Sequence, residues 1–101
     1  MANYQNALEY VKDQMQRGLM TASESNVKMV QMMGIKIVNG KLHSEVRKAL
    51  NEAVKIGELG KVKKDGLKPE IYHHKNARAR ALTEQDRIER EAKSLLNKHF
   101  A

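Results

Sequence analysis

The sequence predicts an α+β fold that is mainly helical and carries a small β-ribbon. First, apolar residues recur at the three- and four-residue spacing of amphipathic helices in four stretches of the chain. Second, short segments containing Val62 and Ile71 flank the turn-forming pair Asp65-Gly66, which is typical of a two-stranded ribbon. Third, a length of 101 residues provides for one modest hydrophobic core.

Two helices are expected at the start of the chain. The first should span Tyr4–Gln16 and end at Gly18. The second should follow Thr21, because Thr21-Ala22-Ser23-Glu24 has the spacing of a capping box. In this motif the Thr21 hydroxyl accepts from the amide of Glu24, and the Glu24 carboxylate accepts from the amide of Thr21. The second helix should end at Gly34. Its expected buried residues are Val27, Val30 and Met33 or their neighbours.

A short strand and a third helix come next. Ile35–Val38 is β-branched and starts with an alternating pattern, which predicts one brief strand, and Asn39-Gly40 ends it. The third helix is expected over residues 41–56 and should end at Gly57. Its apolar stripe consists of Leu42, Val46, Ala49, Leu50, Ala53 and Val54.

The ribbon is expected over residues 59–73. Val62 and Ile71 should face inward while lysines alternate outward, so the ribbon has a basic tip. Pro69 cannot donate to a β-ladder and should therefore lie at an edge or in the loop.

The last part of the chain is expected to be a connector and a helix. Residues 74–81 are basic and give weak structural signals. The helix should begin near Thr83 as its N-cap and run to about Lys98. This divides the chain into residues 1–75 and a C-terminal segment, 76–101. The narrow apolar stripe of the helix either covers the open side of the domain or pairs with a second copy in a homodimer. It consists of Ile88, Ala92, Leu95 and Leu96.

The positive charge is concentrated in the middle of the chain. The net charge is +7, and residues 41–80 carry +6 of it. A polyanionic partner is the simplest explanation, because cations that neutralise phosphates release condensed counterions. Two ordinary alternatives are a solvated lysine-rich surface and lysines that protect exposed strand edges from pairing.

The order of these elements resembles the winged-helix family of DNA-binding domains. The likeness covers roughly residues 4–74 and is strongest over Ser44–Tyr72, where an amphipathic helix closes on Gly57-Glu58-Leu59 and a lysine-rich ribbon follows. In this sequence the short strand precedes the third helix, whereas the family more often places it between the first two helices. The resemblance implies a winged helix-turn-helix fold with an extra C-terminal helix.

The resemblance also implies how DNA would be bound. The third helix would enter the major groove, and the wing, residues 60–72, would touch the backbone or the minor groove. With Val46 at the centre of the buried face, residues 44, 48, 51 and 55 point away from it. Arg and Lys can pair with guanine, and Asn can pair with adenine. The expected base contacts are His43, Ser44, Arg47, Lys48 and Asn51. The expected backbone contacts are Lys41, Lys55, Lys61, Lys63, Lys64, Lys68, Lys75, Arg78 and Arg80.

No constellation of residues points to catalysis, a cofactor or a metal. The sequence has no Cys, which excludes disulfides, cysteine-based zinc fingers and thiol chemistry. His43-Ser44-Glu45 contains the residue types of a triad, but neighbours on a helix diverge by about 100° and cannot align. His73 and His74 are adjacent on a strand, point to opposite faces and are expected to be solvated or to face phosphate.

The sequence therefore predicts a non-enzymatic protein that binds double-stranded DNA with sequence preference, as a small transcriptional regulator. No apolar run approaches the ~20 residues of a membrane span, and the N-terminus lacks a secretory signal, so a cytoplasmic, nucleoid-associated protein is expected. No small-molecule substrate is evident. Two alternatives remain open: a winged-helix module that binds an acidic protein partner, and an architectural or RNA-binding protein.

Overall fold

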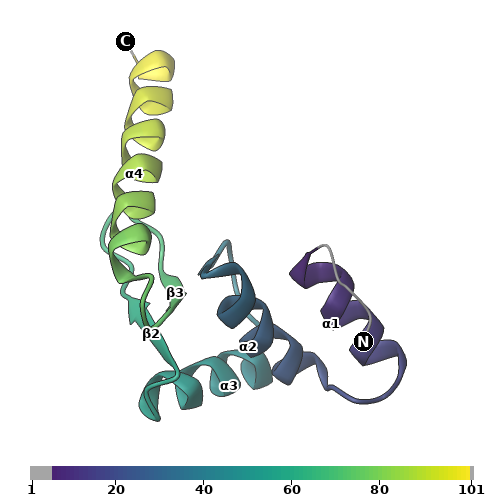
Figure 1. The fold of residues 1–101 in the computed structure, drawn as a ribbon. Helices are drawn as coiled ribbons and strands as arrows, with labels where there is room; N and C mark the ends of the chain where they lie inside the picture. The colour runs from purple at the N-terminus through teal and green to yellow at the C-terminus, as the bar shows by residue number, and fades with distance from the viewer. Residues whose placement is uncertain (1–5, 101) are drawn as a thin grey trace.

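The computed structural model describes residues 6–100, with side chains as far as Lys98. These residues form helices around a three-stranded sheet (Figure 1), which confirms the mainly helical α+β class. The predicted start of the first helix at Tyr4 lies outside the described residues. The elements are α1 (Ala7–Gln16), α2 (Ala22–Met33), β1 (Ile35–Ile37), α3 (Ser44–Lys55), β2 (Leu59–Val62), β3 (Ile71–His74) and α4 (Arg78–Phe100).

The first two helices begin at side-chain caps. The Asn6 side chain accepts a hydrogen bond from the backbone N–H of Glu9 at 2.9 Å. The Thr21 hydroxyl accepts one from the backbone N–H of Glu24 at 3.2 Å, as the capping box predicts. The reciprocal bond differs from the prediction. The Glu24 carboxylate accepts from the Thr21 hydroxyl itself, at 3.1 Å, because a hydroxyl can accept and donate at the same time.

The sheet is antiparallel throughout and has the order β1-β3-β2. The short strand predicted before the third helix therefore joins the ribbon as its third strand. Ile71 of β3 lies opposite both Ile37 and Val62, and Tyr72 lies opposite both Lys36 and Lys61. Because side chains alternate along a strand, Ile71 and Tyr72 face opposite sides of the sheet.

Helices α2 and α3 cover the Tyr72 side of the sheet. Tyr72 and Leu50 are fully buried there, and α1 packs on α2 with Val11 buried. The predicted apolar stripe of the third helix faces this core, with Val46 and Val54 partly buried against it. The buried residues of the cluster are Val30, Leu50, Ala53, Leu59 and Tyr72.

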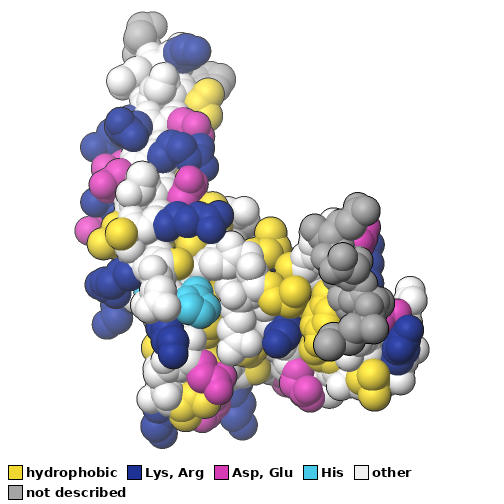
Figure 2. All heavy atoms as spheres, viewed as in Figure 1, with side chains coloured by type: hydrophobic (Ala, Val, Ile, Leu, Met, Phe, Trp, Pro, Cys, Tyr) yellow, Lys and Arg dark blue, Asp and Glu magenta, His cyan; other side chains and the backbone are white. Residues whose placement is uncertain are grey.

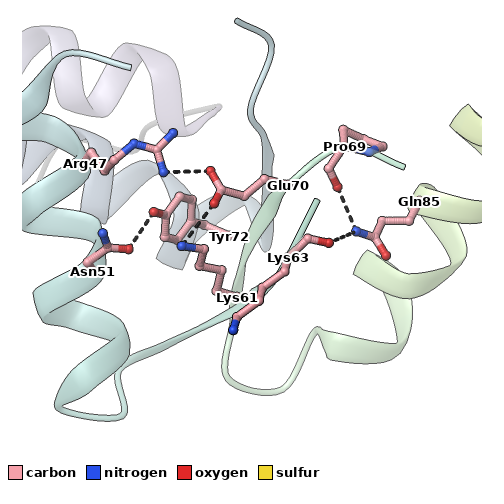
Figure 3. Close-up of polar contacts among 8 residues, drawn as sticks. All are labelled: Arg47, Asn51, Lys61, Lys63, Pro69, Glu70, Tyr72 and Gln85. Carbon is pink, nitrogen blue, oxygen red and sulfur yellow. Dashed lines mark hydrogen bonds and ion pairs between the residues drawn. The ribbon is translucent and has the colours of Figure 1, made fainter. Parts of the chain in front are cut away.

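Helix α4 covers the Ile71 side of the sheet with its first turns. Ala81 is fully buried against Val62 and Ile71, which confirms that these two ribbon residues face inward. Gln85, one turn further along, is also buried, and its side-chain amide donates to the carbonyls of Lys63 at 3.0 Å and Pro69 at 2.7 Å (Figure 3). Gln85 therefore joins the two ends of the loop between β2 and β3.

The beginning of α4 corrects the sequence prediction. The helix starts at Arg78, and Thr83 lies inside it, with its hydroxyl donating to the carbonyl of Ala79 at 3.0 Å. The residues expected to form a connector include Ala79 and Ala81, which have high helix propensity, and burial of Ala81 against the sheet fixes this first turn.

Two expected side-chain environments are also corrected. Met33 is 52% exposed, because α2 ends there and the chain turns through Gly34, at a φ of +95°, to enter β1. His73 is buried instead of solvated, because β3 is the central strand. The His73 Nδ1–H donates to the carbonyl of His74 at 2.7 Å.

The remainder of α4 projects from the molecule. A helix of 23 residues is about 35 Å long, and Figure 1 shows its C-terminal half standing clear of the other elements. None of the helices in the described part of the chain is both long and apolar enough to cross a bilayer.

The packing of His73 on Gly60 predicts the effect of adding one methyl group. A Cβ at position 60 would overlap the His73 ring. We expect Gly60→Ala to lower the free energy of unfolding by about 2–3 kcal/mol in a urea titration. Gly40→Ala is the control: it meets open space at a φ of +80° and should cost only about 1 kcal/mol of backbone strain. In a His73→Ala background the cost of Gly60→Ala should largely disappear, and equal costs in both backgrounds would contradict this packing.

Candidate nucleic-acid interface

A basic groove lies between the start of α3, the connection that leads into α3, and the loop between β2 and β3. Its volume is about 640 Å³. Val38, Leu67 and Pro69 contribute apolar surface, and the acidic residue Glu70 also lines the groove. The structure brings four of the predicted DNA contacts together in its lining: Lys41, Arg47, Lys64 and Lys68.

The outer side of α3 presents the row of residues that the helical spacing predicts. All four side chains of the row are exposed: Ser44, Lys48, Asn51 and Lys55. His43 caps the helix, and its Nδ1 accepts a hydrogen bond from the backbone N–H of Glu45 at 3.3 Å. In the neutral ring the proton is then on Nε2, so His43 presents a donor at the beginning of the row.

Glu70 links α3 to the sheet. Its carboxylate accepts from the Arg47 guanidinium at 2.9 Å and forms an ion pair with the Lys61 ammonium at 3.0 Å (Figure 3). The Glu70 side chain is only 15% exposed. Burial alone would raise the pKa of Glu70, but the hydrogen bonds from Lys61 and Arg47 outweigh burial, so the pKa lies below its ordinary value. The hydrogen bond to Glu70 likewise raises the pKa of Arg47.

Asn51 is held by the central strand. Its side-chain carbonyl accepts a hydrogen bond of 2.6 Å from the Tyr72 hydroxyl, and the Lys61 ammonium lies 5.4 Å from the centre of the Tyr72 ring (Figure 3). A bidentate contact with adenine uses both the oxygen and the nitrogen of the amide. Asn51 could make that contact only if the Tyr72 hydroxyl shared or released the oxygen.

Six of the predicted backbone contacts fall into two groups, one before and one after β3. Lys63 and Lys64 are exposed on the loop between β2 and β3, where Lys64 lines the groove, and Lys68 pairs with Asp86 of α4 at 3.2 Å. The hydrogen bond to Asp86 raises the pKa of Lys68.

The second group follows the other end of β3. Lys75 and Arg78 are exposed there, and Arg80 donates to the backbone carbonyl of Met33 at 3.1 Å. The structure therefore does not bring these three cations to the groove at the start of α3. Lys55, in the last turn of α3, is also distant along the helix from Arg47, by about 12 Å of helical rise.

Three residues that position the site were missed by the sequence analysis. Glu70 is one of only two acids in the lysine-rich ribbon, and this isolation was a signal that it neutralises specific cations. Gln85 stands four residues after Ala81 on the same helical face, which marks it as a polar residue among buried ones. The hydrogen bond of the Tyr72 hydroxyl joins residues 21 apart and has no local sequence signal.

Charges of both signs occur together along α4. Figure 2 shows Lys and Arg side chains alternating with Asp and Glu along α4 on the face that is drawn. Among the described residues, no three His, Asp or Glu side chains lie close enough together to hold a metal ion.

No protein-family model, no curated protein and no solved structure shows a significant match to this chain. The residues of the groove and of α3 are therefore what supports a function.

The position of Glu70 predicts a pH dependence of stability. Its lowered pKa means that it stabilises the fold above its ordinary pKa of 4.5, and that this contribution is lost as the pH falls through the lower folded value. At pH 7 we expect the free energy of unfolding of Glu70→Gln to be about 1–2 kcal/mol lower than that of the unchanged protein. The difference should shrink steadily below pH 4.5 in urea titrations.

The matched control is Glu52→Gln, which changes an exposed carboxylate on α3. It should alter stability by less than about 0.5 kcal/mol at either pH. A stability difference for Glu70→Gln that is the same at pH 7 and pH 3 would contradict the role of the Glu70 carboxylate.

Proposed function

We propose that this protein binds double-stranded DNA, with α3 in the major groove and the β2–β3 loop along the phosphate backbone. The observation that carries the proposal is the adjacency of the α3 row and the basic groove. Arg47 connects the two, because it lines the groove and lies about 60° around the helix from Ser44, the first residue of the row. A duplex laid along α3 would meet the row with its base edges and the groove lysines with its phosphates.

The support of the loop favours this arrangement. Gln85 holds both ends of the loop by hydrogen bonds, and Lys68 is held to α4 by Asp86. A loop that is already fixed loses little conformational entropy when it binds. Lys63 and Lys64 at the loop remain exposed and are therefore available to phosphates.

The arrangement of the elements supports the resemblance to winged-helix domains. Helix α3 packs on α2, and the β2–β3 ribbon follows α3 directly, in the position that a wing would take. Base readout by Lys48 and Asn51 would give sequence preference, as expected of a small transcriptional regulator in the cytoplasm.

Charge reversal tests the proposed surface. We expect Lys48→Glu and Lys64→Glu each to weaken binding to a mixed-sequence duplex roughly tenfold at 50 mM salt. Lys64→Glu should also reduce the slope of log affinity against log salt by about 1, because one phosphate contact is lost. Fluorescence anisotropy of a labelled duplex at several salt concentrations measures both quantities.

Lys12→Glu is the matched control, because Lys12 is exposed on α1, outside the groove and α3. Its effect on binding should be less than half as large on a logarithmic scale. Absence of binding at micromolar protein and low salt, or equal losses for all three variants, would refute the proposed surface.

A second candidate is DNA binding without sequence preference, as in an architectural protein. The intramolecular bonds of Arg47 and Asn51 favour it, because these are the side chains best suited to read guanine and adenine. Selection from a random duplex pool separates the two functions. Sequence-preferring binding predicts an enriched site and a loss of about 1–3 kcal/mol at one base pair in Asn51→Ala. Architectural binding predicts no enriched site and the same affinity ratios with and without Asn51.

A further inference from the structure

The buried face of α4 continues beyond the sheet that covers it. Positions 81, 85, 88, 92 and 95 fall within about 80° of one another on a helical projection. Ala81 and Gln85 are buried by the sheet of the same molecule. Ile88 and Ala92 are partly buried, and Leu95 is 59% exposed. One continuous face thus passes from a packed to an uncovered environment along the helix.

The C-terminal half of α4 exposes apolar side chains, which is unusual for a helical segment that projects from its own domain. Leu95 and its neighbour Leu96, which is 45% exposed, belong to the C-terminal half of α4, and Figure 1 shows no other element beside that half. A helix is stabilised in water mainly by packing its apolar face, and a free segment of three turns is marginal. The face therefore calls for an occupant that offers a matching apolar stripe.

We propose that the C-terminal half of α4 pairs with the same segment of a second copy in an antiparallel arrangement. The fold favours this direction. On each copy the first turns of the same face are covered by the sheet, so only the segment from Ile88 onward is free. An antiparallel pair places the two sheets at opposite ends of the helix pair, whereas a parallel pair would bring both against one end.

The charges beside the stripe complement each other in the antiparallel direction only. Glu91 and Lys98 lie on the same flank of the stripe. When Ala92 of one copy is opposite Leu95 of the other, Glu91 of each copy comes opposite Lys98 of the second copy. The two-fold axis repeats this pair, so the dimer gains two ion pairs. In a parallel pair Glu91 would instead lie beside Leu96 of the second copy, with no charge partner.

The length of the apolar stripe determines the dimer affinity that we expect. From Ile88 to Lys98 the helix is about 15 Å long, so a pair of these segments buries less surface than a standard-sized protein interface. We therefore expect a dissociation constant on the order of 10–100 μM. This inference does not depend on DNA binding and can be tested without nucleic acid.

The first experiment measures mass against concentration for the full chain by sedimentation equilibrium, from roughly 5 to 500 μM. The expected result is a monomer–dimer equilibrium that Leu95→Glu abolishes. Leu19→Glu is the control, because Leu19 is similarly exposed, at 64%, but lies between α1 and α2 and should leave the dimer intact. Circular dichroism checks that each variant keeps its helix content. A chain that stays monomeric to 500 μM overturns the proposal and leaves the stripe to a different partner.

The second experiment tests the direction of pairing. Glu91→Lys and Lys98→Glu should each raise the dissociation constant roughly tenfold, because each places like charges at both symmetric pairs. The double variant restores opposite charges with their positions exchanged, and should return the constant to within about threefold of the original. If the double variant is no tighter than either single variant, the antiparallel register is wrong. Restoration would not follow from helix stability alone, because intrahelical pairs such as Arg87–Glu91 at 2.7 Å are not restored by the exchange.

Discussion

The whole arrangement depends on strand β3, which pairs with another strand along each edge and packs against helices on each face. Ile71 and His73 point toward α4, while Tyr72 points toward α2 and α3. Each layer therefore takes its position from alternate residues of one four-residue strand. Gly60 belongs to the same constraint, because only a residue without a side chain leaves room for the His73 ring on the neighbouring strand.

The candidate interface is held together by the same strand. Tyr72 of β3 bonds Asn51, and Glu70, just before the strand, bonds Arg47, so two α3 residues are held by partners in or directly before β3. These two hydrogen bonds fix α3 relative to the β2–β3 loop. The α3 row therefore lies next to the basic groove. The bond to Glu70 also means that a phosphate approaching Arg47 meets a cation that already has a carboxylate partner. The site therefore combines side chains that are fixed by intramolecular bonds with exposed lysines that have fewer intramolecular partners.

Patterns local in the chain were sufficient to predict most elements, whereas contacts between distant residues were not. The cap at Thr21, the helix ending before Gly57 and the inward direction of Val62 and Ile71 each depend on a few neighbouring residues. The start of α4 was misjudged because burial of Ala81 against the sheet, and not a polar cap, fixes its first turn. Of the site, the exposed α3 row was predictable from helical spacing. The intramolecular partners of Arg47, Asn51 and Lys68 were not, because they lie on other elements.

The central position of β3 has a consequence for biosynthesis. β2 and β3 are close in the chain and can form a hairpin early. β1 can pair only after β3 has been synthesised, because Ile35 lies opposite His73. Until the first turns of α4 have left the ribosome, one apolar side of this sheet has nothing to cover it. Ile35, Ile37, Val62 and Ile71 would then be open to nonspecific association, so a nascent chain halted shortly after His74 is the species most prone to aggregate.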